Sequence, residues 1–210
     1  MASSARYPVP AADHRVTDVV KGSRFITTAA RAADVETAKS VINGIRREFP
    51  DATHHCFAYV VGPPGDSRCA GSSDGGEPGG TAGVPMLSVL LNCGVGDIVV
   101  VVTRYFGGTK LGRGGLVRAY AGSVKHVVRE IELVERVEFV EMRIEVGLAV
   151  VDAVRRLVSL NGGAIEAEEF GQGAAFAVRI PEERVSSFEA AVAEATGGRG
   201  RVRRTGASGE

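Results

Sequence analysis

Hydrophobic residues recur with two different periods along the first two-thirds of the chain, and the pattern predicts alternating strands and helices. Val16–Ala29 is rich in strand-forming residues with a polar break near its middle, which is typical of a hairpin or of a bulged strand. Asp34 is placed to cap a helix that runs to about Phe49, because apolar residues follow it at helical spacing. Asp97–Thr103 is a continuous apolar run, as expected for a central strand covered on both faces.

The last third of the chain has a different pattern, which begins where charge and period change near Glu132–Glu138. Strand-like and helix-like segments follow in the order β-α-β-β-α-β, with a hairpin expected about Gly171–Gly173. That order favours a compact α+β sandwich whose helices lie on one face of the sheet. We therefore expect two domains, residues 15–134 and 135–204, flanked by a flexible N-terminus at 1–14 and a flexible tail at 205–210.

The turn that follows Asp97–Thr103 and leads into a long amphipathic helix carries the strongest functional signal. Lys110 and Arg113 lie among its glycines, which let a backbone approach a ligand closely. A helix N-terminus adds unpaired N–H groups and partial positive charge, so the pattern predicts an anion-binding turn. The same glycines also suit a tight connection with solvated cations. The candidate residues are Arg104, Tyr105, Gly107, Gly108, Lys110, Gly112, Arg113, Gly114, Gly115 and Arg118.

A second glycine-rich stretch, Ser72–Pro85, lies upstream and carries the acidic residues Asp74 and Glu77. Most of it belongs to a long glycine-rich loop, Gly62–Gly83, and loops of that length in compact domains are usually functional or mobile. The two carboxylates suit ligand contact, metal binding, acid–base chemistry or pairing with the cations of the later turn. A structural role is also open, in which Thr81 caps the helix that Pro85 enters.

Two histidines and a cysteine, His54, His55 and Cys56, precede or begin a predicted strand that runs to Val61. A His-x-Cys pair can ligate zinc, but a structural zinc site needs four ligands and a catalytic site usually needs three. Cys69 is the only further candidate nearby. We therefore expect Cys56 to be a small buried hydrophobe, and we predict no metal, no cofactor and no catalytic residue.

Composition narrows the class of protein further. Lys and Arg number 25 and Asp and Glu number 25, so binding to a nucleic acid would require a local basic patch. The three cysteines do not make a disulfide framework, and no apolar run is long enough to span a bilayer, so we expect a cytoplasmic protein without a membrane partner. The arginines of Gly200–Arg204 suit contact with RNA phosphates and a charged edge strand equally well.

Four segments resemble the YigZ/IMPACT family and follow one another in the order of its motifs. They are KGSRFI at Lys21–Ile26, THHCFAYVVG at Thr53–Gly62, SSDGGEPGGTAGVPML at Ser72–Leu87 and VVTRYFGGTKLGRGGLVRAY at Val101–Tyr120. The resemblance implies a first domain similar to the second domain of small-subunit ribosomal protein five and to domain four of elongation factor G. It implies a ferredoxin-like second domain, similar to the fifth domain of that factor. Gly75, Gly79 and His55 depart from the family pattern, in which Asp, Ser and Asn are usual.

The residues and the resemblance together favour a cytoplasmic, translation-linked binding protein. Its partners would be RNA, the ribosome, or a translation factor or regulatory protein, contacted through the cationic glycine turn. The alternative is a small enzyme that acts on a phosphorylated substrate between that turn and the acidic loop. A third interpretation has the glycines serve only close packing. The oligomeric state is left open.

Overall fold

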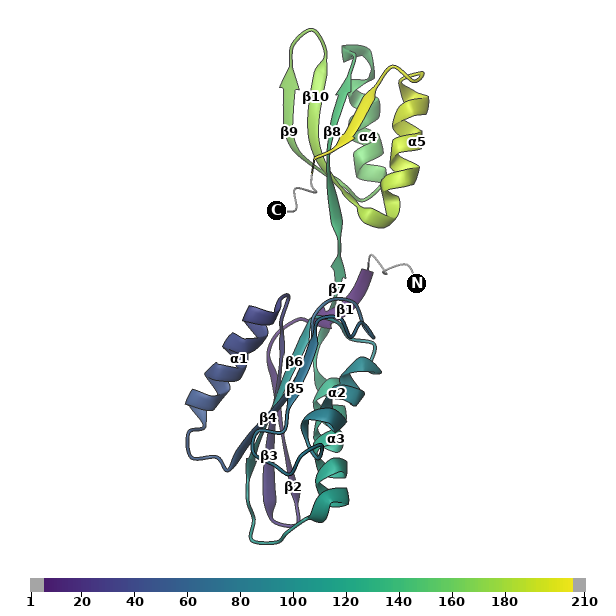
Figure 1. Ribbon diagram of the computed structural model, residues 1–210. Coiled ribbons are helices and arrows are strands. Elements are labelled where there is room, and N and C mark those ends of the chain that lie inside the picture. Colours follow the sequence, from purple (N-terminus) through teal and green to yellow (C-terminus); the bar gives the residue numbers. More distant parts are fainter. Residues whose placement is uncertain (1–5, 206–210) are drawn as a thin grey trace. The chain divides into compact units, whose positions relative to one another are not determined.

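The computed structural model describes residues 6–205, so the predictions of flexibility for residues 1–5 and 206–210 lie outside the described residues. Contacts divide the chain into two compact units, Met1–Arg136 and Val137–Glu210 (Figure 1). The predicted mixed α and β class is confirmed in both units.

Within residues 6–136, the first unit contains a five-stranded antiparallel sheet in the order β2-β3-β6-β4-β5. Three helices pack against it (Figure 1). The strands are β2 (His14–Val20), β3 (Ser23–Arg31), β4 (His54–Val60), β5 (Ala70–Ser73) and β6 (Ile98–Tyr105), and the helices are α1 (Val35–Glu48), α2 (Gly83–Leu91) and α3 (Gly112–Glu130).

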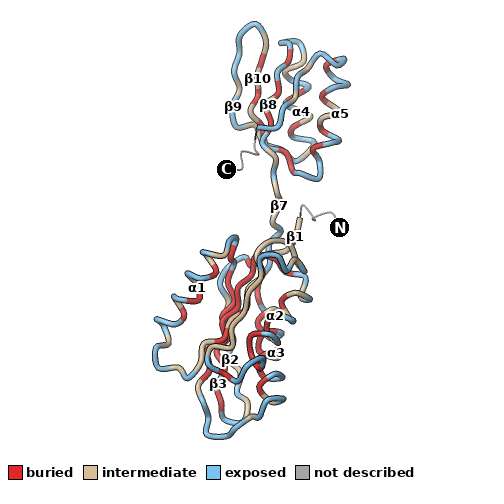
Figure 2. The backbone as a smooth tube through the Cα atoms, viewed as in Figure 1, coloured by how far each residue is buried: buried red, intermediate tan, exposed pale blue. Residues whose placement is uncertain are grey.

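Strand β6 lies in the middle of this sheet and is covered on both faces, as its apolar run predicted. Val100 and Val102 belong to the core shared with α2 and α3, whereas Val99 and Val101 belong to the core beneath α1. Successive side chains of a strand point to opposite faces, so one continuous run of valines serves both cores. Figure 2 shows this buried sheet, in red, between helices that are exposed on their outer sides.

Helix α1 begins as its sequence predicted. The Asp34 carboxylate accepts a hydrogen bond of 2.6 Å from the Thr37 N–H, which satisfies one of the unpaired donors of the first turn. Ala38, Ile42 and Ile45 recur at helical spacing and are buried against the sheet.

Part of the segment predicted to be flexible, residues 6–10, forms a strand. Strand β1 (Arg6–Pro10) pairs with β7 (Leu133–Val137) in a separate two-stranded sheet. The buried Asp97 holds this end of the unit together, because its carboxylate accepts hydrogen bonds from the Tyr7 hydroxyl at 3.2 Å and from the Arg136 guanidinium. The two prolines of β1 hid this strand from the sequence prediction, since proline is usually excluded from a strand that pairs on both sides.

Within residues 137–205, the second unit is a four-stranded antiparallel sheet in the order β11-β8-β10-β9, with its helices on one face. Numbered within the unit, this order is 4-1-3-2, and the elements run βαββαβ, as a ferredoxin-like fold requires. The elements are β8 (Phe139–Val146), a 3-10 turn (Leu148–Val150), α4 (Val151–Leu160), β9 (Ala164–Phe170), β10 (Ala174–Pro181), a second 3-10 turn (Glu182–Arg184), α5 (Val185–Ala195) and β11 (Arg201–Arg204).

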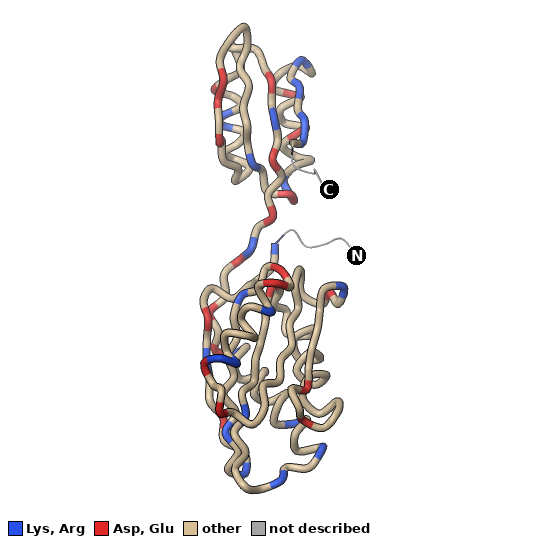
Figure 3. Tube along the Cα trace, turned by 60° about the vertical axis from the view of Figure 1, so that its left-hand side comes forward, with Lys and Arg blue, Asp and Glu red and all other residues tan. Residues whose placement is uncertain are grey.

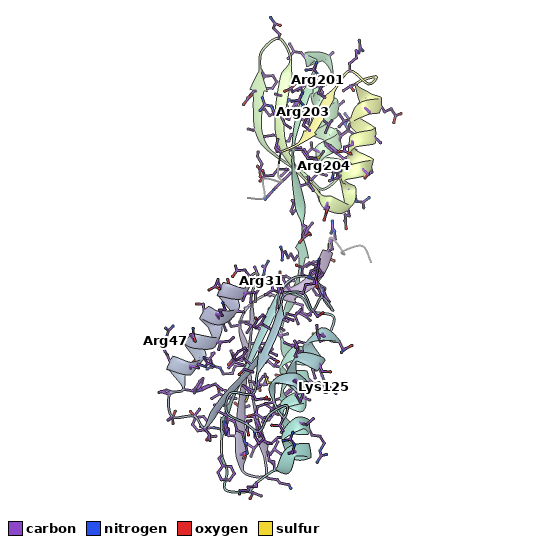
Figure 4. The ribbon with its side chains drawn as sticks, viewed as in Figure 1. Arg31, Arg47, Lys125, Arg201, Arg203 and Arg204 are labelled. Carbon is purple, nitrogen blue, oxygen red and sulfur yellow. The ribbon has the colours of Figure 1, made fainter. Side chains whose placement is uncertain are left out.

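Strand β11 is an edge strand that carries arginines, labelled in Figure 4. Val202 packs toward the core, and Arg201 and Arg203 therefore project from the other face of the strand. Both interpretations of this segment, phosphate contact and protection of a sheet edge, fit that arrangement. Figure 3 shows basic and acidic residues mixed along both units, in keeping with the net charge of zero.

Gly107 allows a close approach between the turn after β6 and the turn between β2 and β3. A Cβ added there would overlap the Gly22 carbonyl group. We predict that Gly107→Ala lowers the free energy of unfolding by about 1–3 kcal/mol, because backbone must move to make room. In the matched control Gly122→Ala, a Cβ in α3 meets nothing within 4 Å, so that change should raise the free energy of unfolding by about 0.5–1 kcal/mol. Urea denaturation of both variants measures these changes, and equal effects would contradict the close approach at Gly107.

Candidate functional site

The two glycine-rich stretches meet at one cavity of about 310 Å³ in the first unit. We call it the α3 cavity, because the N-terminus of α3 forms one of its walls. The acidic loop, the end of β6 and the following turn supply the other walls. Its lining residues are Glu77, Pro78, Arg104, Phe106, Lys110, Leu111, Gly112, Arg113 and Leu116.

A buried ion pair joins the acidic loop to the central strand beside this cavity. The Arg104 guanidinium donates to Glu77 Oε1 at 2.5 Å, and the two side chains are only 6% and 3% exposed. The Tyr120 hydroxyl donates to the same carboxylate oxygen at 2.7 Å, and Arg104 Nη2 donates to Ser23 Oγ at 3.1 Å. A buried charge is tolerated only with such partners, so the pair and its hydrogen bonds fix Arg104 and Glu77 in place.

The hydrogen bonds of Arg104 do not include its Nε. Its Nε is buried and has no hydrogen-bond partner among the described residues, although the guanidinium lies near the rings of Phe25 and Phe106, with centroids at 5.4 and 5.8 Å. A buried donor without an acceptor costs free energy. The cavity wall therefore contains a cation whose hydrogen-bonding capacity is not filled by the residues that the structure describes.

Helix α3 begins at the cavity without a cap. Leu111 occupies the capping position and makes no side-chain hydrogen bond to the first turn, and that turn contains no acidic residue. The unpaired N–H groups and the positive end of the helix dipole therefore lie beside Lys110 and Arg113. Arg113 Nη2 also donates to the Gly79 carbonyl at 2.9 Å, which ties the turn to the acidic loop. The lining combines positive charge with apolar walls.

Asp74 orders the acidic loop and does not line the cavity. Its carboxylate accepts hydrogen bonds from the N–H groups of Gly80 at 2.8 Å and of Ala82 and Gly83 at 2.9 Å each. Burial alone would raise the pKa of Asp74, but these hydrogen bonds outweigh it and hold the pKa below its ordinary value. Asp74, rather than Thr81, therefore satisfies the N–H groups at the start of α2.

The Thr81 hydroxyl instead donates to the Pro78 carbonyl at 2.6 Å and closes a turn within the acidic loop. The interpretation of Thr81 as a helix cap is therefore wrong, since α2 begins after Ala82 with no side-chain cap.

Tyr105 lies on the other face of the sheet from the cavity, because side chains alternate along β6. Its hydroxyl donates to Asp51 Oδ1 at 2.8 Å, and Arg24 lies over its ring at 4.4 Å. Of the other predicted binding residues, Gly107 packs on the β2–β3 turn and Arg118 is exposed farther along α3. The cavity lining includes Arg104, Lys110, Gly112, Arg113 and Glu77, and it omits Tyr105, Gly107, Gly108, Gly114, Gly115, Arg118, Asp74 and Thr81.

Several residues at the site were not predicted as functional. Tyr120 follows the apolar spacing of α3, and its ring packs edge-on against Phe25, so nothing in the pattern reveals that its hydroxyl reaches Glu77. Phe106 carried a usable signal, since a large aromatic residue directly before two glycines is unusual in a solvated turn. Pro78, Leu111 and Leu116 supply apolar walls that only the fold brings together.

The two histidines and the cysteine of β4 are held by contacts within the fold. His55 contacts Thr103 Oγ1 at 3.2 Å and the Phe49 carbonyl at 3.0 Å, and burial lowers its pKa. His54 Nδ1 lies 3.1 Å from the Gly75 carbonyl, and its Nε2 lies 3.9 Å from Glu77 Oε2. Cys56 is buried, as predicted, and burial raises the pKa of its thiol to about 12. No group of three or more potential metal ligands occurs within residues 6–205.

Comparison of the chain with known proteins identifies its family. The family model for the Impact N-terminal domain matches residues 21–128. IMPACT family member YigZ of Escherichia coli (strain K12) is 40% identical over 89% of this chain and 91% of its own length. The chain belongs to the IMPACT family. A second family model, described as a domain of unknown function (DUF1949), matches residues 144–199.

Further relatives support the IMPACT assignment over both units. The IMPACT family member of Haemophilus influenzae is 37% identical over 93% of this chain and 95% of its own length. A solved structure titled as the crystal structure of a hypothetical protein aligns with a TM-score of 0.69 at 37% identity, covering 96% of this chain and 97% of that one. Over its described residues, this IMPACT chain has no helix both long and apolar enough to cross a membrane.

The buried ion pair of Arg104 and Glu77 predicts that stability responds very differently to different mutations at the site. We expect Glu77→Ala to lower the free energy of unfolding by about 3–5 kcal/mol, because it leaves Arg104 buried without its counter-ion. Tyr120→Phe removes one hydrogen bond and should cost only about 1 kcal/mol. The control Glu36→Ala removes an exposed partner of Lys39 on α1 and should cost at most about 0.5 kcal/mol. Urea denaturation measures all three, and a loss for Glu77→Ala as small as the control's would contradict the assignment.

Asp74 predicts a pH dependence with a definite sign. Because its pKa is lower in the folded state, its contribution to stability is present above the ordinary pKa of about 3.9 and is lost as the pH falls through the folded value. Asp74→Asn should therefore lower the free energy of unfolding by about 2 kcal/mol at pH 7 and by less at pH 3. The exposed Asp13→Asn is the control. Urea titrations at both pH values decide, and an Asp74→Asn effect that grows toward pH 3 would be inconsistent with this role.

Proposed function

We propose that this IMPACT family chain is a cytoplasmic, translation-linked protein that binds RNA by holding a phosphate group in the α3 cavity. The observation that supports this proposal is the meeting of Lys110, Arg113 and the uncapped start of α3 at one cavity. Backbone N–H groups at a helix N-terminus, together with basic side chains, are a common means of binding phosphate.

The charge balance of the cavity supports an anionic ligand. Its one acidic lining residue, Glu77, is already compensated by Arg104 at 2.5 Å. Lys110 and Arg113 therefore add positive charge that the lining does not balance. Because the whole chain has a net charge of zero, an RNA strand would be attracted to such a local site rather than to a generally basic surface.

The fold is compatible with a role in translation. The family resemblance implies that both units are similar to the domains of elongation factor G named above, which is an argument from fold alone and therefore a weaker support than the cavity. RNA is favoured over an acidic protein segment because a helix N-terminus and two cations converge at the cavity, which is an arrangement common in phosphate binding. A regulatory protein partner is the alternative outcome of the binding test.

The test measures binding of a short single-stranded RNA by fluorescence anisotropy between about 50 and 200 mM salt. Lys110→Ala and Arg113→Ala should each weaken binding and reduce the slope of log affinity against log salt by about 0.7, because one phosphate contact is lost. The control Arg47→Ala removes an exposed cation on α1, across the sheet from α3 (Figure 4), and should leave the slope unchanged.

Two outcomes would contradict the proposal. If the native chain does not bind RNA even at low salt, the RNA function is wrong, and capture of a protein partner with and without Lys110→Ala becomes the next experiment. If Arg47→Ala weakens binding as much as Lys110→Ala, the RNA is held by diffuse surface charge and not by the cavity.

A second candidate function is turnover of a small phosphorylated substrate. The observation that favours it is the position of the Glu77 carboxylate in the same cavity as Lys110 and Arg113. Glu77 Oε1 already accepts hydrogen bonds from Arg104 and Tyr120, so Oε2 would have to act as the base. Release of phosphate from a panel of phosphorylated compounds, abolished by Lys110→Ala at unchanged melting temperature, would support an enzyme.

A further inference from the structure

The α3 cavity is larger and more apolar than a site for a bare phosphate needs to be. Its volume of about 310 Å³ lies at the lower end of the range for small-molecule sites. Pro78, Phe106, Leu111 and Leu116 share the lining with the charged residues. A ligand that consisted only of an anion would leave these apolar walls in water.

Phe106 is the lining residue best placed to hold a planar group. The residue is 48% exposed although it lies at the mouth of a charged site. Its N–H donates to Thr53 Oγ1 at 3.2 Å, and the N–H of Gly107 donates to Ser23 Oγ at 3.2 Å, so the backbone on both sides is held. An exposed aromatic ring on a fixed backbone is the usual platform on which an unpaired base stacks.

Arg104 makes a purely apolar occupant unfavourable. Its side chain is only 6% exposed, it lines the cavity, and its Nε has no hydrogen-bond partner among the described residues. Protein atoms cover Nε itself, so an occupant meets the charge of the guanidinium rather than this one donor; polar acceptors beside this wall interact favourably with that charge, whereas a hydrocarbon does not. The ligand therefore combines an anionic group, an aromatic face and hydrogen-bond acceptors.

From these features we infer that the α3 cavity receives one unpaired nucleotide of a single-stranded RNA. Its phosphate lies at Lys110, Arg113 and the start of α3, and its base lies against Phe106 and the apolar wall. This inference rests on the proposed function, because it specifies the part of the RNA that the same cavity recognises. A base inside a duplex is already stacked and paired, so duplex RNA would not reach the ring.

The experiment compares Phe106→Leu, which removes the aromatic face and keeps an apolar side chain, with Phe106→Tyr, which keeps the face. Binding of a short single-stranded RNA and of the matching duplex is followed by fluorescence anisotropy. Phe106→Leu should weaken single-strand binding by about 5- to 100-fold. The salt dependence should not change, because no phosphate contact is lost. Phe106→Tyr should bind like the native chain.

Phe170→Leu is the matched control, since Phe170 is also exposed, at 59%, and also lies near an arginine, with Arg155 at 6.0 Å from its ring. It should leave binding unchanged. The melting temperature of each variant is measured in parallel, and Phe106→Tyr guards against a loss of binding that comes from misfolding.

The inference is overturned if Phe106→Leu binds the single strand as tightly as the native chain, or if the duplex binds equally well. In either case, a reduced salt dependence in Lys110→Ala would still support phosphate binding, so the proposed function would survive. A native chain that binds neither RNA contradicts both.

Discussion

The buried ion pair between Arg104 and Glu77 is the interaction on which the candidate site depends. It joins the central strand to the acidic loop, and the Tyr120 hydroxyl joins α3 to the same carboxylate. Burying two charges gains little net stability over an apolar contact of the same shape. The pair instead fixes the positions of the two side chains, because each charge is compensated in only one place. The walls of the cavity are thereby held at fixed distances before any ligand arrives.

Local patterns were sufficient to predict most of the fold. The cap at Asp34, the valines of β6 and the βαββαβ order of the second unit each reflect interactions within a few residues, or a periodicity that burial imposes. The two strands that were missed have no such pattern. Strand β1 contains two prolines, and β5 consists of Ala70–Ser73, which has no large apolar side chain. Pairing determines both strands: β1 pairs with the distant β7, and β5 pairs with the preceding strand β4.

The candidate site was predictable only in part. Lys110, Arg113 and Glu77 stood out by charge among glycines, and the fold brings them to one cavity. Asp74 was an equally strong candidate for the site from its sequence. Its partners are backbone N–H groups six to nine residues onward, which no pattern of side chains reveals. Tyr105 could have been set aside from sequence alone, since Val100, Val102 and Arg104 share one face by the two-residue period of a strand.

The alternation along β6 constrains how the length of this chain can change during evolution. A one-residue deletion just before Arg104 would carry this cation to the face beneath α1 and bring the phenol of Tyr105 toward Glu77. The ion pair would be lost, and the Glu77 carboxylate would remain buried without its counter-ion. We therefore expect length variation in connections such as residues 61–69, between β4 and β5, where added residues shift no register.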